Sequence, residues 1–162
     1  MKSSSDYNKG KFRPKHPEKY RGNVNNIIFR SSWELSFARF LDNNIRVLEW
    51  SSESIVIPYV KFTDNRVHKY YPDFYVKYKD KNNNIKQEII EIMGAHEKKS
   101  AMFILESNFK LMLPSRSKRK KTKEQQLEAA LINASKWAYA IEWCKKRNVA
   151  FKIITENDHM FY

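Results

Sequence analysis

Two acidic residues lie inside otherwise apolar stretches of the chain. Asp73 falls within residues 71–76, and Glu91 follows eighteen residues later within residues 89–93. Both stretches have the apolar and aromatic composition of β-strands. A carboxylate in a strand of the core must be paired, hydrogen-bonded or bound to a metal, because an unpaired buried charge costs too much free energy. The fold must therefore bring partners to Asp73 and Glu91.

The spacing of apolar residues predicts one helix followed by a meander of strands. Trp33, Phe37 and Leu41 recur at helical spacing, which predicts a helix over residues 32–43. Strand-like runs separated by polar turns then follow over residues 46–50, 54–59, 67–78 and 85–93. After them, a long helix is predicted over residues 122–147 and a last strand over residues 150–155. This order predicts one domain of the α/β (α+β) class, with a mixed sheet flanked by helices.

Residues 94–113 fit two interpretations. Residues 98–109 could form a short amphipathic helix, or they could be an extended insertion.

The charge of the chain favours a polyanionic partner. Its 162 residues include 31 Lys and Arg against 18 Asp and Glu, which gives a formal net charge of +13. Such an excess is typical of proteins that bind nucleic acid. The apolar runs are too short to cross a membrane, and the first residues lack the apolar stretch of a secretory signal, so an intracellular protein is expected. A single cysteine, Cys144, excludes an internal disulfide and favours a small buried side chain.

Two segments concentrate the positive charge. Residues 1–29 are basic and poor in aliphatic side chains, which predicts an arm outside the core. Residues 114–123 hold six cations and no acid, and such a block repels itself into an exposed loop. Contacts with DNA phosphates are expected for the second segment, with a solubilising or capsid-contacting tail as the alternative. The N-terminal arm could make the same contacts or dock on a protein partner. The candidate DNA-binding residues are Lys11, Arg13, Arg30, Arg116, Lys118, Arg119, Lys120 and Lys121.

Asp73 and Glu91 together predict a metal centre. Two acids on adjacent strands can hold one divalent cation, and Mg²⁺ prefers oxygen ligands. An ion at that position neutralises a scissile phosphate and helps to deprotonate an attacking water. The pattern therefore favours phosphodiester hydrolysis.

These residues resemble the PD-(D/E)XK nucleases, whose signature is Pro-Asp followed by an acid, any residue and a lysine. Pro72-Asp73 matches its first half, and Glu91 begins its second. Residues 29–34, 47–59 and 70–74 look like the head completion nucleases of T4-type tailed phages and, more distantly, the TnsA-type transposon endonucleases. The similarity covers about residues 7–156. It implies a restriction-endonuclease-like domain over residues 30–156, with an insertion and basic loop at 94–122, an arm at 1–29 and a tail at 157–162.

The resemblance also implies which residues form the active site. In that pattern an N-terminal helix supplies a glutamate, so Glu34, Asp73 and Glu91 would bind Mg²⁺ or Mn²⁺ and form the catalytic triad. Met93 stands where the family has its catalytic lysine. Either a lysine from elsewhere replaces it, or the site is disabled and the chain only binds DNA during head assembly. The candidate replacements are Lys136, on the long helix, and Lys77, Lys98, Lys99 and Lys110.

Each acid also has an ordinary structural interpretation. Ser31 and Glu34 have the spacing of a helix capping box. Asp73 could pair with Lys69, Lys77 or Arg66, and Glu91 with Lys86. Glu88 is expected on the opposite face of its strand from Glu91 and in contact with solvent.

The resemblance implies a Mg²⁺-dependent DNA endonuclease that trims or processes DNA during head maturation. DNA is then the expected partner, together with phage portal or head–neck proteins. The host cell cytoplasm or the virion is the expected location. The sequence leaves the oligomeric state unassigned.

Overall fold

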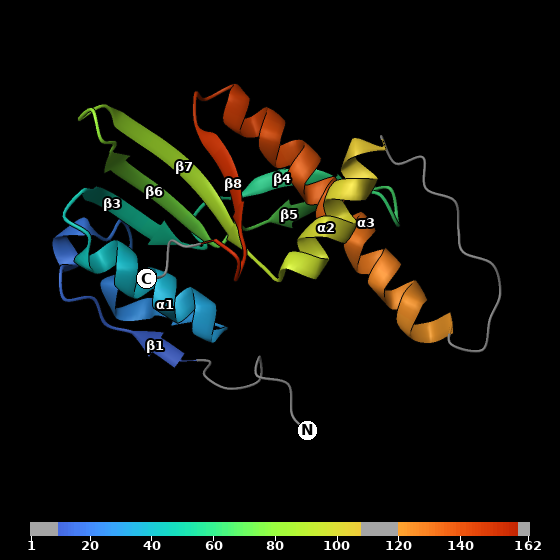
Figure 1. Ribbon diagram of the computed structural model, residues 1–162, viewed down its shortest axis with the longest axis horizontal. Coiled ribbons are helices and arrows are strands. Elements are labelled where there is room, and N and C mark those ends of the chain that lie inside the picture. The colour runs from blue at the N-terminus through green and yellow to red at the C-terminus, as the bar shows by residue number, and fades with distance from the viewer. Residues whose placement is uncertain (1–9, 108–119, 159–162) are drawn as a thin grey trace.

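The main layer of the molecule is a four-stranded mixed sheet. The computed structural model describes residues 10–107 and 120–158, and its main sheet has the strand order β3-β6-β7-β8 (Figure 1). These strands are β3 (Val47–Ser52), β6 (Phe74–Lys79), β7 (Ile85–Ile92) and β8 (Ala150–Ile154). β8 runs parallel to β7, whereas the other neighbours are antiparallel. A parallel pair needs a long crossover, which helices α2 (Ala95–Glu106) and α3 (Lys120–Lys145) supply here.

Helix α1 (Ser32–Asn43) covers one face of this sheet, and its bounds confirm the predicted helix. Its buried residues Phe37 and Leu41 belong to a core cluster with Trp50, Phe74 and Ile90 from the sheet. Trp33 shares the helical spacing but is 42% exposed, so the apolar face of α1 is narrower than its sequence pattern.

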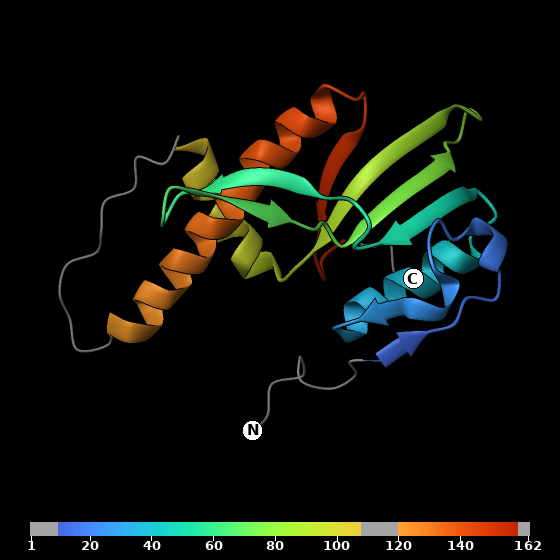
Figure 2. The ribbon, with the colours of Figure 1, turned by 180° about the vertical axis from the view of Figure 1, so that it is seen from behind.

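The other face packs against α3 and a separate β-hairpin, β4 (Ile57–Lys61) and β5 (Arg66–Tyr70), as both ribbon views show (Figure 2). Ile89 of β7 and Tyr70 of β5 share one cluster with Cys144 of α3, and this buried cysteine agrees with its predicted role. α2 packs against α3 in a further cluster that contains Met93 and Trp137. The mixed sheet between these two layers confirms the predicted fold class.

The single strand predicted over residues 67–78 is wrong. The structure breaks it at residues 71–73 into β5 and β6, which belong to different sheets. Pro72 lies at the break, and its missing N–H group cannot join a central ladder. The break leaves Asp73 directly before β6.

Residues 10–29 are not an arm outside the core, which corrects the prediction for this part of the chain. Phe12 of β1 (Gly10–Phe12) and Ile27 of β2 (Ile27–Phe29) are buried in the cluster beneath α1. The segment also contains the 3₁₀ turns η2 (Pro17–Lys19) and η3 (Val24–Asn26). Buried Asp42 of α1 fixes it by accepting the backbone N–H groups of Lys15 (2.7 Å) and His16 (3.0 Å).

Within residues 94–107 and 120–122, the described parts of the segment predicted as an insertion and basic loop, the chain is largely helical. Of the two interpretations of residues 98–109, the helix is confirmed, because α2 spans Ala95–Glu106. α3 begins two residues before its predicted start, so Lys120 and Lys121 lie in a helix rather than a loop. Arg116, Lys118 and Arg119 lie outside the described residues.

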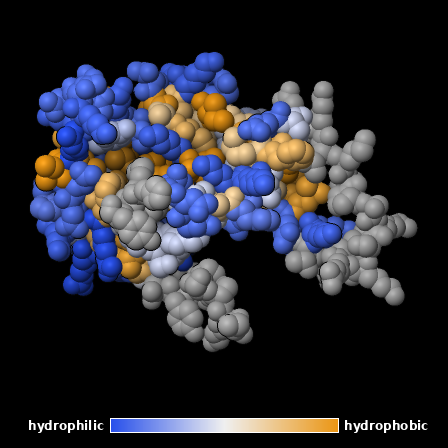
Figure 3. Space-filling model, in the orientation of Figure 1, coloured by the Kyte–Doolittle hydropathy of each residue, from blue (hydrophilic) through white to orange (hydrophobic). Residues whose placement is uncertain are grey.

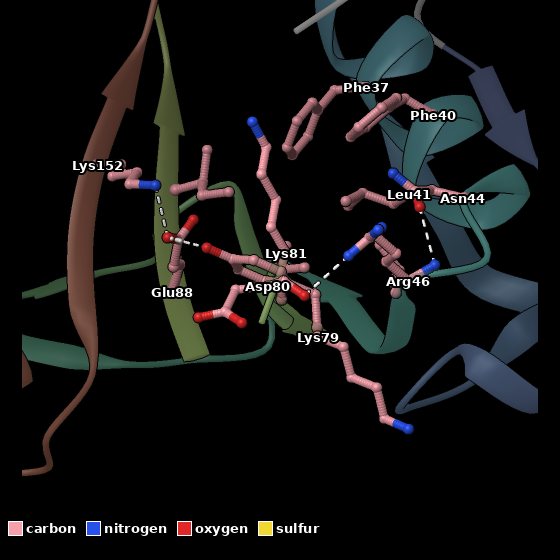
Figure 4. A pocket seen from close by; sticks show the side chains of 14 residues that line it. Phe37, Phe40, Leu41, Asn44, Arg46, Lys79, Asp80, Lys81, Glu88 and Lys152 are labelled. Atoms are coloured by element: carbon pink, nitrogen blue, oxygen red, sulfur yellow. Dashed lines mark hydrogen bonds and ion pairs between the residues drawn. The ribbon is translucent and has the colours of Figure 1, made fainter. Parts of the chain in front are cut away.

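Glu88 is buried, which corrects the expectation that it contacts solvent. Only 6% of it is exposed. Lys152 of β8 forms an ion pair with it at 2.6 Å, and the Tyr78 hydroxyl donates to it at 2.7 Å. Figure 4 shows this ion pair at a cavity of about 440 Å³ between α1 and the sheet. A cation distant in sequence therefore makes burial of this acid tolerable.

Hydrophilic residues cover much of the face seen in Figure 3, with smaller apolar patches between them. No helix in the described part of the chain is long and apolar enough to cross a membrane.

Candidate functional site

The register of the sheet places Asp73, directly before β6, beside Glu91 of the neighbouring strand β7. Phe74 of β6 pairs with Ile90 of β7 in an antiparallel ladder, so the residues that flank this pair lie next to each other. The Ile92 N–H group donates to Asp73 Oδ2 at 2.7 Å and thereby joins the two strands beyond their last pair.

The surroundings of Asp73 oppose its negative charge. Burial raises the pKa of this carboxyl well above its usual range, and the charge of Glu91 raises it further. The N–H group of Ile92 acts in the opposite direction, whereas the charges of Glu34 and Glu53 add to the repulsion. Asp73 therefore lies in an acidic site with too little positive charge.

Glu91 has more support than Asp73. Burial raises its pKa, but a hydrogen bond from Tyr70 and the positive charge of Lys136 lower it. The Tyr70 hydroxyl donates to Glu91 Oε2 at 2.7 Å. Lys136 Nζ lies 5.5 Å from the centroid of the Tyr70 ring, within the range of a cation–π contact. Helix α3 thus brings Lys136, one of the predicted replacement lysines, to the side of Glu91.

Glu34 forms the helix cap that was one of its two interpretations. Ser31 is the N-cap of α1 and accepts the Glu34 N–H group at 3.1 Å. In return, Glu34 accepts from the Ser31 hydroxyl at 3.1 Å and from the Arg30 N–H group at 2.9 Å. Its charge nevertheless acts on both Asp73 and Glu91. Capping and proximity to the two strand acids are therefore compatible.

Met93 packs into the core between α2 and α3. It is 8% exposed and belongs to the cluster of α2 and α3 with Ala101, Ile104 and Trp137. It also lines a cavity of about 470 Å³ that includes Glu34. A thioether at this wall supplies no charge to a phosphate.

The acids fit a divalent ion bound through few protein ligands. Within residues 10–107 and 120–158, no three His, Cys, Asp or Glu side chains gather closely enough to hold a metal. Mg²⁺, however, is commonly held by one or two carboxylates, with waters and substrate phosphates as its other ligands. Asp73 and Glu91 supply two such carboxylates, and the repulsion between their charges favours the binding of a cation.

The predicted DNA-binding residues of the N-terminal segment are exposed. Lys11 and Arg13 line a cavity of about 380 Å³ together with Lys15 and Arg39. Arg30 lies nearer the acids, and its pKa is raised by its hydrogen bond to Glu53 and by the charges of Glu34 and Asp73. Lys11 and Arg13 thus belong to a basic surface of the N-terminal segment. Arg30 lies beside the acidic site instead.

The structure places at the site two residues to which the sequence assigned no role. The Tyr70 hydroxyl donates to Glu91. The Glu53 N–H group donates to the carbonyl oxygen of Asp73 at 3.0 Å. The proximity of Tyr70 to Asp73 in sequence was the available signal for the first, and no local pattern marks the second.

Comparisons with known proteins identify the family of the chain. The family model of the TnsA-like endonuclease N-terminal domain matches residues 44–156. The head completion nuclease of Enterobacteria phage T4 is 30% identical over 148 residues, which cover 91% of each chain. No solved structure gives a significant match. Both matches support a nuclease role, and the chain belongs to the TnsA-like endonuclease family.

Proposed function

We propose that this chain is a metal-dependent DNA endonuclease. The observation that carries the proposal is the pair of buried carboxylates, Asp73 directly before β6 and Glu91 on the adjacent β7, with Lys136 of α3 acting on the second. When bound, Mg²⁺ or Mn²⁺ supplies positive charge at the scissile phosphate and activates a water for attack. Asp73 and Glu91 would hold that ion, and the negative charge of Glu34, which acts on both of them, would add to its attraction.

The chain's own residues would do the remaining work. Tyr70 keeps one oxygen of Glu91 fixed through its hydrogen bond, so the other oxygen can face the ion. Lys136 would take the place of the motif lysine, because its charge already acts on Glu91. Lys11, Arg13 and Arg30 would contact phosphates and fix the DNA backbone without reading its sequence.

The name of the phage T4 relative supports a narrower role. In this proposal the chain trims or processes DNA during completion of a phage head, in the host cell or on the virion. DNA is its substrate, and portal or head–neck proteins are its candidate partners.

One observation favours a second function. The chain has Met93 where the family has its catalytic lysine, and this side chain packs among apolar residues of α2 and α3. A chain that keeps the nuclease fold without cleaving would serve as a DNA-binding head-assembly factor.

A cleavage assay separates the two functions. Supercoiled, linear and branched DNA would be incubated with the parent, Asp73→Asn, Lys136→Met and Lys145→Met, with Mg²⁺, Mn²⁺ or EDTA. Lys145 is an exposed lysine at the end of the same helix and serves as the matched control. We expect metal-dependent cleavage by the parent and by Lys145→Met, and a loss of about 100-fold or more in the other two. Salt-sensitive DNA binding without cleavage by the parent would establish the assembly factor instead.

A further inference from the structure

Glu53 holds the guanidinium of Arg30 by one edge. Arg30 Nε donates to Glu53 Oε1 at 2.8 Å, and Arg30 Nη2 donates to Oε2 at 3.1 Å. This two-point contact fixes the plane of the guanidinium. It uses two of the five N–H donors of Arg30 and leaves three for another acceptor. The Arg30 side chain is 57% exposed, so a ligand from solution can reach it.

The backbone of Glu53 is held in an unusual conformation. Its φ angle is +47°, in the left-handed region that residues with a Cβ atom seldom occupy. Its N–H group donates to the carbonyl oxygen of Asp73 at 3.0 Å. An exposed ion pair adds only about 0–1 kcal/mol to stability, so the pair with Arg30 is a weak structural reason to keep this conformation. Strained backbone of this kind tends to occur at functional sites.

Arg30 is tied to the acidic site through its backbone as well. Its N–H group donates to Glu34 Oε2 at 2.9 Å. The guanidinium also feels the charges of Glu34 and Asp73, in addition to that of Glu53. The backbone and the side chain of Arg30 are thus both fixed beside the acids, on the side of α1. Lys136 approaches Glu91 from α3 instead.

We propose that Glu53 is a positioning residue that presents the free edge of Arg30 to the scissile phosphate. Arg30 then supplies at the phosphate a charge that Met93 cannot. A guanidinium with one edge fixed loses little conformational freedom when its other edge binds a phosphate. This inference rests on the proposed endonuclease function. It assigns a role in that function to Glu53, which lies outside the PD-(D/E)XK signature.

The test compares kcat and KM for duplex DNA cleavage with Mg²⁺. Glu53→Gly removes the carboxylate and suits the positive φ angle, so its Tm should equal or exceed that of the parent. We expect its kcat to fall by about 10-fold or more, because guiding groups of this kind are worth roughly 10–100-fold, with KM changed less. Arg30→Gln should lose about 100-fold, and Arg30→Lys should not restore the rate, since an ammonium lacks the two-point geometry.

The double variant shows whether Glu53 acts through Arg30. Arg30→Gln combined with Glu53→Gly should be no slower than Arg30→Gln alone. Arg46→Gln, which removes an exposed guanidinium that donates to the carbonyl oxygen of Asp80 at 2.8 Å, is the control and should keep the parent kcat. Parent-like kcat in Glu53→Gly, or losses that multiply in the double variant, would overturn the inference while leaving the endonuclease intact. If neither the parent nor Arg46→Gln cleaves, the proposed function fails and this inference fails with it.

Discussion

Asp73 shows how a single side chain can lower the stability of the fold that holds it. In the folded state, burial and the charge of Glu91 raise its pKa well above the usual range, whereas in the unfolded chain the pKa is ordinary. The carboxylate is therefore more easily charged when the chain is unfolded. Its contribution to stability is complete at low pH and is lost as the pH rises through the folded pKa.

We expect Asp73→Asn to stabilise the metal-free protein at pH 8, since the amide cannot ionise and its oxygen can still accept the Ile92 N–H group. Each unit by which the folded pKa exceeds the ordinary value corresponds to about 1.4 kcal/mol, and 1 kcal/mol shifts Tm by roughly 2–4 °C for a chain of this size. Thermal melts from pH 4 to pH 8 in EDTA measure the effect. The two Tm curves should converge toward low pH, and parallel curves would contradict the assignment.

At the scale of an element, Glu34 at the N-terminus of α1 has two functions. Ser31 caps the helix, and the Glu34 carboxylate closes the cap while its charge reaches Asp73 and Glu91. Substitutions can separate these functions, because an amide preserves the acceptor oxygen but removes the charge.

Ser31→Ala should lower the free energy of unfolding by about 1 kcal/mol, as expected for a lost helix cap, and leave Mg²⁺ affinity near that of the parent. Glu34→Gln should do the reverse, with little change in stability and weaker Mg²⁺ binding. Urea unfolding and calorimetric titration with Mg²⁺ measure the two quantities. Equal Mg²⁺ affinity in the parent and Glu34→Gln would limit Glu34 to its capping role.

Helix α2 supplies apolar side chains around position 93. Met93 lies on the same face of the chain as Glu91 but packs under α2, against Ala101 and Ile104. A lysine there would place its charge among apolar side chains.

We therefore expect Met93→Lys to destabilise the protein by roughly 2 kcal/mol or more and not to increase cleavage. Met93→Leu, which nearly conserves volume, should cost less than about 1.5 kcal/mol and is the matched control. Chemical unfolding and the cleavage assay are the measurements. A stable, faster Met93→Lys enzyme would show that the amine escapes the cluster and reaches the acids.

Local patterns predicted the elements that carry their own signals. The bounds of α1 follow from its cap and its helical spacing. The pairing of β6 with β7, which brings Asp73 close to Glu91, follows from two apolar runs. The packing of residues 10–29 against α1 could not be predicted in this way, since it depends on Asp42, which lies far along the chain. Glu88 was misjudged for the same reason, because Lys152, its partner, lies on β8.

At the scale of the whole molecule, the chain has a net charge of +13 but contains a small acidic site. The N-terminal segment contributes exposed cations that line one cavity, Lys11 and Arg13 among them. Such a distribution should hold DNA mainly through its backbone, with affinity that falls steeply as salt rises.

Removing both cations, as Lys11→Gln with Arg13→Gln, should reduce the slope of log K against log salt by about 0.9 for each lost phosphate contact. Lys145→Gln with Lys146→Gln changes the net charge equally at the far end of α3 and is the control. Fluorescence anisotropy with a labelled duplex over a series of salt concentrations gives both slopes. Identical slopes in the two double variants would mean that net charge, and not this surface, determines binding.

The order of the elements along the chain has a consequence for synthesis. Glu34, Asp73 and Glu91 all precede Lys136, which follows Glu91 by 45 residues. At translation rates of about 5–20 residues per second, Glu91, the last of the three acids, leaves the ribosome roughly 2–9 s before the lysine. β8, which completes the sheet beside β7, follows later still. If Lys136 is the catalytic cation, a nascent chain cannot cut nearby DNA until α3 has left the ribosome.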